Sequence, residues 1–155
     1  MKLYSLERFQ SLPIPLDKAW DFLSSPKNLS KISPPYMGFK IVSYLNGNKK
    51  IYHGQVITYK VKPIAGIPLR WVSEISQYKE PNFFVDEQKS GPFKFWKHEH
   101  YLKEIPGGTE MRDMLQYAMP FGILGSVANS LIVRKQLEEI FDYRRKRLEI
   151  IFGEM

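Results

Sequence analysis

The sequence has no cysteine and no long uninterrupted hydrophobic segment. Without thiols the chain cannot form disulfides, iron–sulfur clusters, thiolate metal sites or a cysteine nucleophile, and their absence suits a reducing compartment. No apolar stretch approaches the roughly 20 residues that span a bilayer. Glu7 and Arg8 interrupt the region that would be apolar in a signal peptide. We therefore predict a cytoplasmic protein without a transmembrane segment.

What the chain does contain is typical of one globular domain, which we expect to span residues 1–155. Hydrophobic residues make up 43% of it and charged residues 25%. The formal net charge of +7 would permit salt-sensitive binding to nucleic acid or to an anionic membrane. The basic residues are spread along the chain, however, and the one cluster, at 144–147, would point in several directions on a helix. We therefore expect no nucleic-acid partner.

Proline, glycine and the hydrophobic periodicity divide the chain into one strand, two short helices, a run of strands and a long final helix. The expected helices cover 16–23, 27–32 and 121–152, and the expected strands 3–12, 39–45, 51–62, 69–78, 83–88, 93–104 and 109–119. Pro34 and Pro35 predict an extended path after the second helix. Asn46-Gly47-Asn48 predicts a tight turn between the second and third strands.

Short connections between consecutive strands predict an antiparallel meander. The final helix carries apolar residues at helical spacing, and we expect this face to be buried on the sheet: Leu124, Val127, Leu131, Leu137, Phe141, Leu148 and Ile151. One long amphipathic helix packed on an antiparallel sheet gives a two-layer α+β domain. Arg144 lies on the same stripe, and a core-facing arginine needs a carboxylate or carbonyl partner.

Four segments carry a resemblance to a known family. They are LPIPLDKAWDFLSSPKNLSKISPP at 12–35, FVDEQKSGPFKFWKHEH at 84–100, GTEMRD at 108–113 and RKQLEEIFDYRRKRL at 134–148. Together they resemble the START-like, helix-grip superfamily (SRPBCC, polyketide cyclase/dehydrase-like), and within it a bacterial cyclase/dehydrase-like subgroup. The resemblance implies a curved antiparallel sheet of about seven strands, two short helices and a long C-terminal helix enclosing a cavity. It gives no role to Asp142, Tyr143 or Arg144.

Two histidines on one strand form the most informative polar pattern. Lys97, Glu99 and Lys103 must face water, which sends Trp96, His98, His100 and Leu102 inward. On the next strand Asp113 shares a face with Met111, Leu115 and Tyr117, and it should lie opposite His100 or one step away, near His98. Asp86 faces inward on the preceding strand if Phe84 does.

Three interpretations of these histidines and aspartates stay open. They can form a satisfied structural network, a polar anchor for the head of an apolar ligand, or an acid–base or metal site. A His-x-His pair is a weak metal signal, since a third neutral ligand is missing and nothing places His53 nearby. We predict no metal and no cofactor; the ring-hydroxylase metal pattern is not visible here, and phosphate-loop and dinucleotide motifs are absent as well.

Aromatic residues make up 14% of the chain, which suits either a packed core or a cavity for flat, apolar ligands. The predicted ligand-binding residues are Trp71, Phe84, Asp86, Trp96, His98, His100, Met111, Asp113, Tyr117 and Phe141. The leading predicted function is binding or transport of a lipid, isoprenoid or polyketide-like aromatic. The alternative is a polyketide cyclase or dehydratase that uses His98, His100 and Asp113 for acid–base chemistry. No oligomeric state is predicted.

Overall fold

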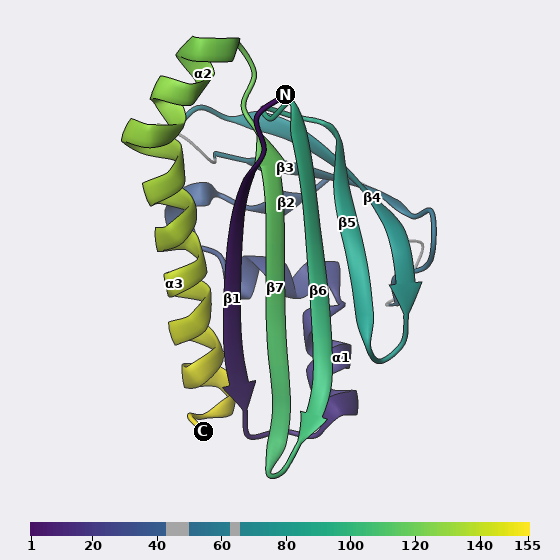
Figure 1. Ribbon diagram of the computed structural model, residues 1–155. Helices are drawn as coiled ribbons and strands as arrows, with labels where there is room; N and C mark the ends of the chain where they lie inside the picture. The colour runs from purple at the N-terminus through teal and green to yellow at the C-terminus, as the bar shows by residue number, and fades with distance from the viewer. Residues whose placement is uncertain (43–49, 63–65) are drawn as a thin grey trace.

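The computed structural model describes residues 1–42, 50–62 and 66–155, and these form a seven-stranded sheet with helices on one face (Figure 1). All neighbouring strands are antiparallel, in the order β1-β7-β6-β5-β4-β3-β2. The strands are β1 (Tyr4–Leu12), β2 (Lys40–Ile41), β3 (Val56–Val61), β4 (Leu69–Lys79), β5 (Phe83–Ser90), β6 (Phe95–Ile105) and β7 (Gly108–Ala118). The predicted meander is confirmed for β2 to β7, and β1 joins the sheet beside β7.

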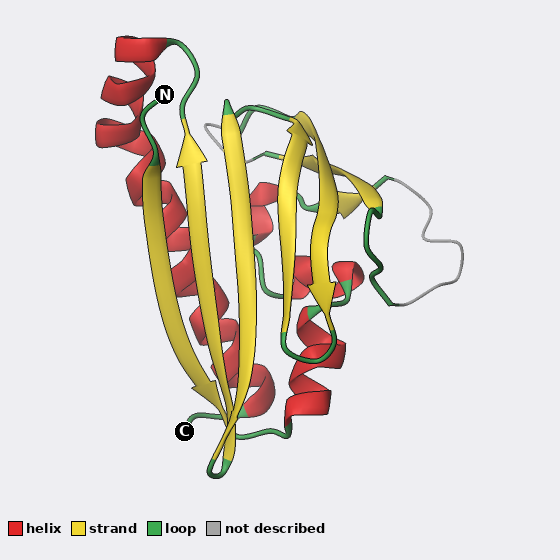
Figure 2. Cartoon of the chain, turned by 45° about the vertical axis from the view of Figure 1, so that its right-hand side comes forward, coloured by secondary structure: helices red, strands yellow, loops and turns green. Residues whose placement is uncertain are grey.

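Helical segments stand before and after the meander. They are α1 (Leu16–Leu23), the 3₁₀ turns η1 (Pro26–Lys31) and η2 (Pro35–Met37), and a continuous C-terminal run of α2 (Gly122–Ala128), the π-helical turn η3 (Asn129–Val133) and α3 (Arg134–Phe152). Both α1 and α3 lie on the same face of the sheet, and α2 extends beyond the sheet's end (Figure 2). The predicted two-layer α+β architecture is therefore confirmed.

Strand alternation places the core between these two layers. On β7 every second side chain is buried, which turns Met111, Asp113, Leu115 and Tyr117 toward the helices. From α3 the buried residues Leu137, Phe141 and Leu148 pack against that face. The inward direction predicted for these residues is confirmed.

Several strand boundaries differ from the prediction. The strand expected at 39–45 is ordered only as β2, and the predicted turn at 46–48 lies outside the described residues. The next strand begins at Val56 rather than residue 51, because Gly54 adopts φ 84° and Gln55 N–H donates to the Tyr52 carbonyl, closing a turn. The extended path predicted after Pro34 is wrong at η2, since the fixed φ of Pro35 also suits a helical first position.

The buried stripe predicted for the final helix is correct for most of α3, where only Ile151 is exposed, by 37%, and it is wrong for α2 and η3. Leu124, Val127 and Leu131 are exposed by 76%, 51% and 71%, and the buried residues at this end are Gly125, Asn129 and Val133. Six residues separate Leu131 from Leu137, a step that leaves the two side chains about 120° apart on an ideal α-helix. The two apolar stripes therefore face different ways.

Candidate functional site

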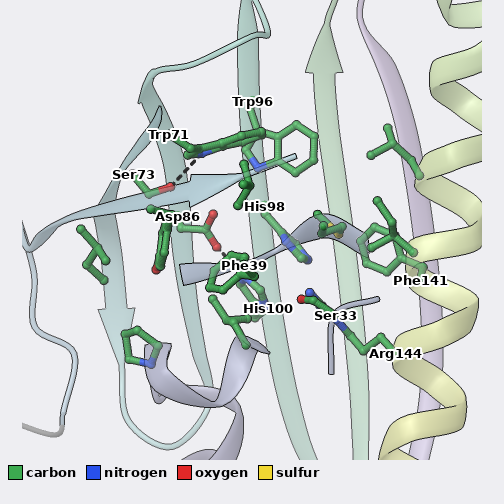
Figure 3. A pocket seen from close by; sticks show the side chains of 18 of the residues that line it. Ser33, Phe39, Trp71, Ser73, Asp86, Trp96, His98, His100, Phe141 and Arg144 are labelled. Carbon is green, nitrogen blue, oxygen red and sulfur yellow. Dashed lines mark hydrogen bonds and ion pairs between the residues drawn. The ribbon is translucent and has the colours of Figure 1, made fainter. Parts of the chain in front are cut away.

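A cavity of about 160 Å³ lies between the sheet and the helices. Its wall is mainly apolar and is drawn from β3, β4, β5, β6, η1 and α3, with further residues from loops. Among its lining residues are Leu29, Phe39, Ile57, Val61, Trp71, Ile75, Phe93, Trp96, Leu137, Ile140 and Phe141. Four ionisable side chains, Asp86, His98, His100 and Arg144, share one part of this wall (Figure 3). The arrangement is an apolar chamber with a polar wall.

Both histidines of the polar wall are held by carboxylates. His98 Nε2 lies 2.8 Å from Asp113 Oδ1, and His100 Nε2 lies 2.6 Å from Asp86 Oδ2. His100 Nδ1 is a further 3.3 Å from Asp113 Oδ1. The strands bring Asp86 opposite His98 and Asp113 opposite His100, so the close side-chain bonds run diagonally across the ladder. Three adjacent strands are thus joined through four side chains.

The carboxylate contacts favour a particular protonation of each ring. Because an ionised carboxylate can only accept, His98 carries its proton on Nε2 and His100, with a carboxylate at each nitrogen, carries two. Burial lowers the pKa of His98, and the neighbouring His100 lowers it further. Burial alone would lower the pKa of His100 as well, but its interactions with Asp113 and Asp86 outweigh that effect and raise it. Relative to an ordinary imidazole, the site therefore favours the neutral form of His98 and the imidazolium form of His100.

The charges of the polar wall balance. Burial alone would raise the pKa of Asp113, but hydrogen bonding to His100 and His98 outweighs it and holds the pKa well below its usual value. The pKa of Asp86 is lowered against burial in the same way, by His100. Arg144 Nη1 reaches to 3.6 Å from Asp113 Oδ1. When His100 is protonated, two carboxylates thus face two cations, the pairing that buried charges need.

Aromatic rings sandwich the two imidazoles. The His98 and His100 rings stack with centroids 3.7 Å apart, and Phe84 stacks on the other side of His100 at 4.1 Å. Phe141 meets His98 edge-on at 5.6 Å, and the Arg144 guanidinium lies 5.1 Å from the Phe141 ring. This packing fixes the ring orientations, as a preorganised site needs.

The structure separates the predicted ligand-binding residues into two groups. Seven of them line the cavity: Trp71, Phe84, Asp86, Trp96, His98, His100 and Phe141. Met111, Asp113 and Tyr117 are buried but do not line it. Asp113 holds the imidazoles from behind, and the Tyr117 hydroxyl donates to Asn129 Oδ1 at 2.6 Å. Strand parity predicts which side chains face inward. It does not predict which of these inward side chains line the cavity.

Sequence reasoning gave no role to one cavity residue, Arg144, and missed several others. Arg144 has the carboxylate partner that its place on the stripe required. Ser33, Phe39 and Tyr59 line the cavity from segments where no inward face was derived. Gln136 and Ile140 line it from α3, and the helical stripe that contains Leu137 and Phe141 is the signal that could have found them.

The polar wall also contains the atoms of a candidate metal site. Ligand atoms of Asp86, His98 and His100 lie within 4.8 Å of one another. Both His100 nitrogens already face carboxylates, however, and Arg144 adds a positive charge beside them. A metal ion would have to displace the proton that holds Asp86 to His100. The donor arrangement therefore suits a proton-linked network better than a metal.

Comparison with solved structures identifies the fold. A START superfamily protein from Mycobacterium smegmatis superposes with a TM-score of 0.70 at 12% identity, covering 95% of this chain and 98% of that one. Ginseng major latex-like protein 151 from Panax ginseng gives 0.68 at 12% identity, with 97% of each chain covered. Protein CV1439 from Chromobacterium violaceum gives 0.70 at 10% identity, covering 97% and 98%.

No family model matches the chain, and no curated protein matches it either. Within the described residues, none of the helices combines the length and the apolar character needed to cross a bilayer. The likeness to the solved structures extends over nearly the whole chain and includes the sheet and the long C-terminal helix. The chain therefore has the START-like, helix-grip fold.

Proposed function

We propose that the protein binds an apolar small molecule, such as a lipid, an isoprenoid or a polyketide-like aromatic, in the cavity between the sheet and α3. The observation that carries this proposal is the combination of an apolar chamber with a single polar wall. Ligand sites in proteins share this character, since the apolar surface supplies affinity and a few polar groups fix orientation. The cytoplasm remains the predicted location.

The size of the cavity limits what it encloses. Its volume of about 160 Å³ is close to that of an engineered apolar cavity of roughly 150 Å³ that binds benzene. The enclosed part of the ligand is therefore about as large as one aromatic ring. A polar group on that ring would meet His98, whose Nε2 is engaged by Asp113 and whose Nδ1 is left to accept a hydrogen bond.

Native mass spectrometry and organic extraction of the freshly purified protein test this proposal, together with titration of the uncharged fluorophore N-phenyl-1-naphthylamine. We expect a bound molecule or saturable fluorophore binding. Ile140→Trp should fill the cavity and abolish binding, because Ile140 lines it. Glu139→Trp is the matched control, since Glu139 is exposed on the adjacent position of α3. A protein that is empty and does not bind the fluorophore would contradict the proposal.

A second candidate function, acid–base catalysis on a polyketide-like substrate, is favoured by one observation. Asp113 holds the Nε2 proton of a neutral His98 that lines the cavity, which is the orientation of a general base. His98→Ala separates the two functions, with Ser33→Ala as the control at another polar lining position. A binding role predicts lost retention of the extracted molecule, whereas catalysis predicts retained binding and turnover reduced by about a hundredfold or more.

A further inference from the structure

Six large apolar side chains are exposed together at the start of the C-terminal helical run. We call them the helix-tip patch: Phe121, Ile123, Leu124, Val127, Leu131 and Ile132. Their exposed fractions lie between 51% and 83%. They fall within 12 consecutive residues, from the N-cap of α2 to η3, and α2 extends beyond the sheet (Figure 1). Contiguous apolar exposure of this kind marks an interaction surface.

The inner face of the same segment holds the patch outward. A Cβ atom at Gly125 would collide with the Pro120 carbonyl oxygen, so the helix lies directly on the preceding chain. The Tyr117 hydroxyl donates to Asn129 Oδ1 at 2.6 Å, and the Tyr4 hydroxyl donates to Ser126 Oγ at 3.2 Å. Turning the patch inward would break these contacts. Its exposure is therefore a property of the folded protein.

Exposed lysines surround the patch. Three segments meet at this end of the sheet, since Tyr4 pairs with Tyr117 and the Lys94 amide donates to the Ala118 carbonyl. These segments, residues 1–6, 88–98 and 114–137, contain six basic residues, of which Lys89, Lys97 and Arg134 pair with Glu74, Glu99 and Glu138. Exposed lysines stand on each of them: Lys2, Lys94 and Lys135. The charge is complementary to an anionic surface.

We propose that the helix-tip patch docks on an anionic lipid bilayer, with its apolar side chains in the interfacial region and the lysines beside lipid phosphates. Interfacial helices combine an apolar face with Lys or Arg in this way. A second copy of the chain is a poorer occupant, because it would bring two basic rims and two net charges of +7 together. Val133 and Gln136, directly after the patch, line the cavity. Docking would therefore bring one end of the cavity wall close to the bilayer.

Co-sedimentation of the full-length protein with vesicles tests the proposal. We expect binding to vesicles of phosphatidylcholine and phosphatidylglycerol in about a two-to-one ratio, much weaker binding to pure phosphatidylcholine, and loss of binding at high salt. The double variant Ile123→Ser/Leu124→Ser should weaken binding by about tenfold or more, because it removes two of the side chains that enter the interface. Lys94→Glu/Lys135→Glu should reduce binding to the anionic vesicles.

Matched controls lie outside the patch. Ile67→Ser removes an apolar side chain that is 58% exposed, and Lys18→Glu reverses an exposed charge on α1. Neither should change vesicle binding. Because the chain has no cysteine, Leu124→Cys and Ile67→Cys also accept a single environment-sensitive fluorophore. Only the label at residue 124 should be quenched by brominated lipid.

Each alternative result overturns the proposal. If the wild-type protein does not co-sediment with anionic vesicles, the helix-tip patch does not dock on a bilayer. Vesicle binding that survives Ile123→Ser/Leu124→Ser would place the contact elsewhere. A concentration-dependent dimer that this double variant dissociates, without vesicle binding, would assign the patch to a second copy. None of these results depends on whether the cavity holds a ligand.

Discussion

The two ends of the C-terminal helical run expose opposite kinds of surface. In α3 the apolar stripe faces the sheet, and Leu148 has no exposed surface. In α2 the apolar stripe faces outward, with Leu124 76% exposed, while a glycine and an asparagine face inward. Both stripes have helical periodicity, so periodicity identifies the helix at both ends but not the direction of its apolar face.

The largest expected effect compares one leucine from each end. Leu148→Ala should lower the free energy of unfolding by about 2–5 kcal/mol, because it opens a cavity in a packed core. Leu124→Ala should change it by no more than about 0.5 kcal/mol, since an exposed side chain gives up no packing. Urea unfolding of the two variants measures the difference. Equal losses would mean that the α2 stripe is buried in solution.

A smaller effect is expected from the charge that α3 contributes to the polar wall. Arg144→Met leaves two carboxylates facing one imidazolium, and breaking a fully buried pair costs about 3–5 kcal/mol. The 3.6 Å separation and 13% exposure of Arg144 reduce this to an expected loss of roughly 1–3 kcal/mol. Lys146→Met, at an exposed position of the same helix, is the control. An unchanged free energy of unfolding in Arg144→Met would show that Arg144 does not stabilise the network.

Sequence reasoning predicted most of the fold because its signals are local. Strand parity placed His98 and His100 inward since burying Lys97 or Glu99 would leave charges without partners. It also placed Asp113 opposite His100 or one step away, near His98, because the turn before β7 is short, and the observed register is the first of these. Contacts within adjacent strands of a meander follow from spacing alone.

Features that depend on distant parts of the chain could not be predicted in this way. The contact of Arg144 with Asp113 joins residues from α3 and β7, and no local pattern reports it. The direction of the α2 stripe depends on Asn129, which is buried because Tyr117 reaches it from β7. The position of the cavity likewise depends on how many side chains pack together. Strand parity alone therefore could not distinguish Phe84, which lines the cavity, from Met111, which does not.

The smallest expected effect is a pH dependence of the free energy of unfolding. It arises from His98 and His100 of the polar wall and not from the helix-tip patch. His100 has a raised pKa, so its contribution to stability is complete below the ordinary imidazole value of about 6.5 and is lost as pH rises through the raised value. His98 has a lowered pKa, so its contribution is complete above about 6.5 and is lost as pH falls toward the lowered value. Urea unfolding across this range should therefore show a loss of stability on both sides.

Single variants separate the alkaline loss of stability from the acidic one. His100→Asn should remove the loss on the alkaline side and His98→Asn the loss on the acidic side, while His53→Asn, at an exposed position, should change neither. Residues 114–137 contain no histidine or carboxylate, so vesicle binding by the helix-tip patch should not follow this profile. An alkaline loss of stability that persists in His100→Asn would show that His100 is not the titrating group. The doubly protonated ring assigned from its two carboxylate contacts would then be wrong.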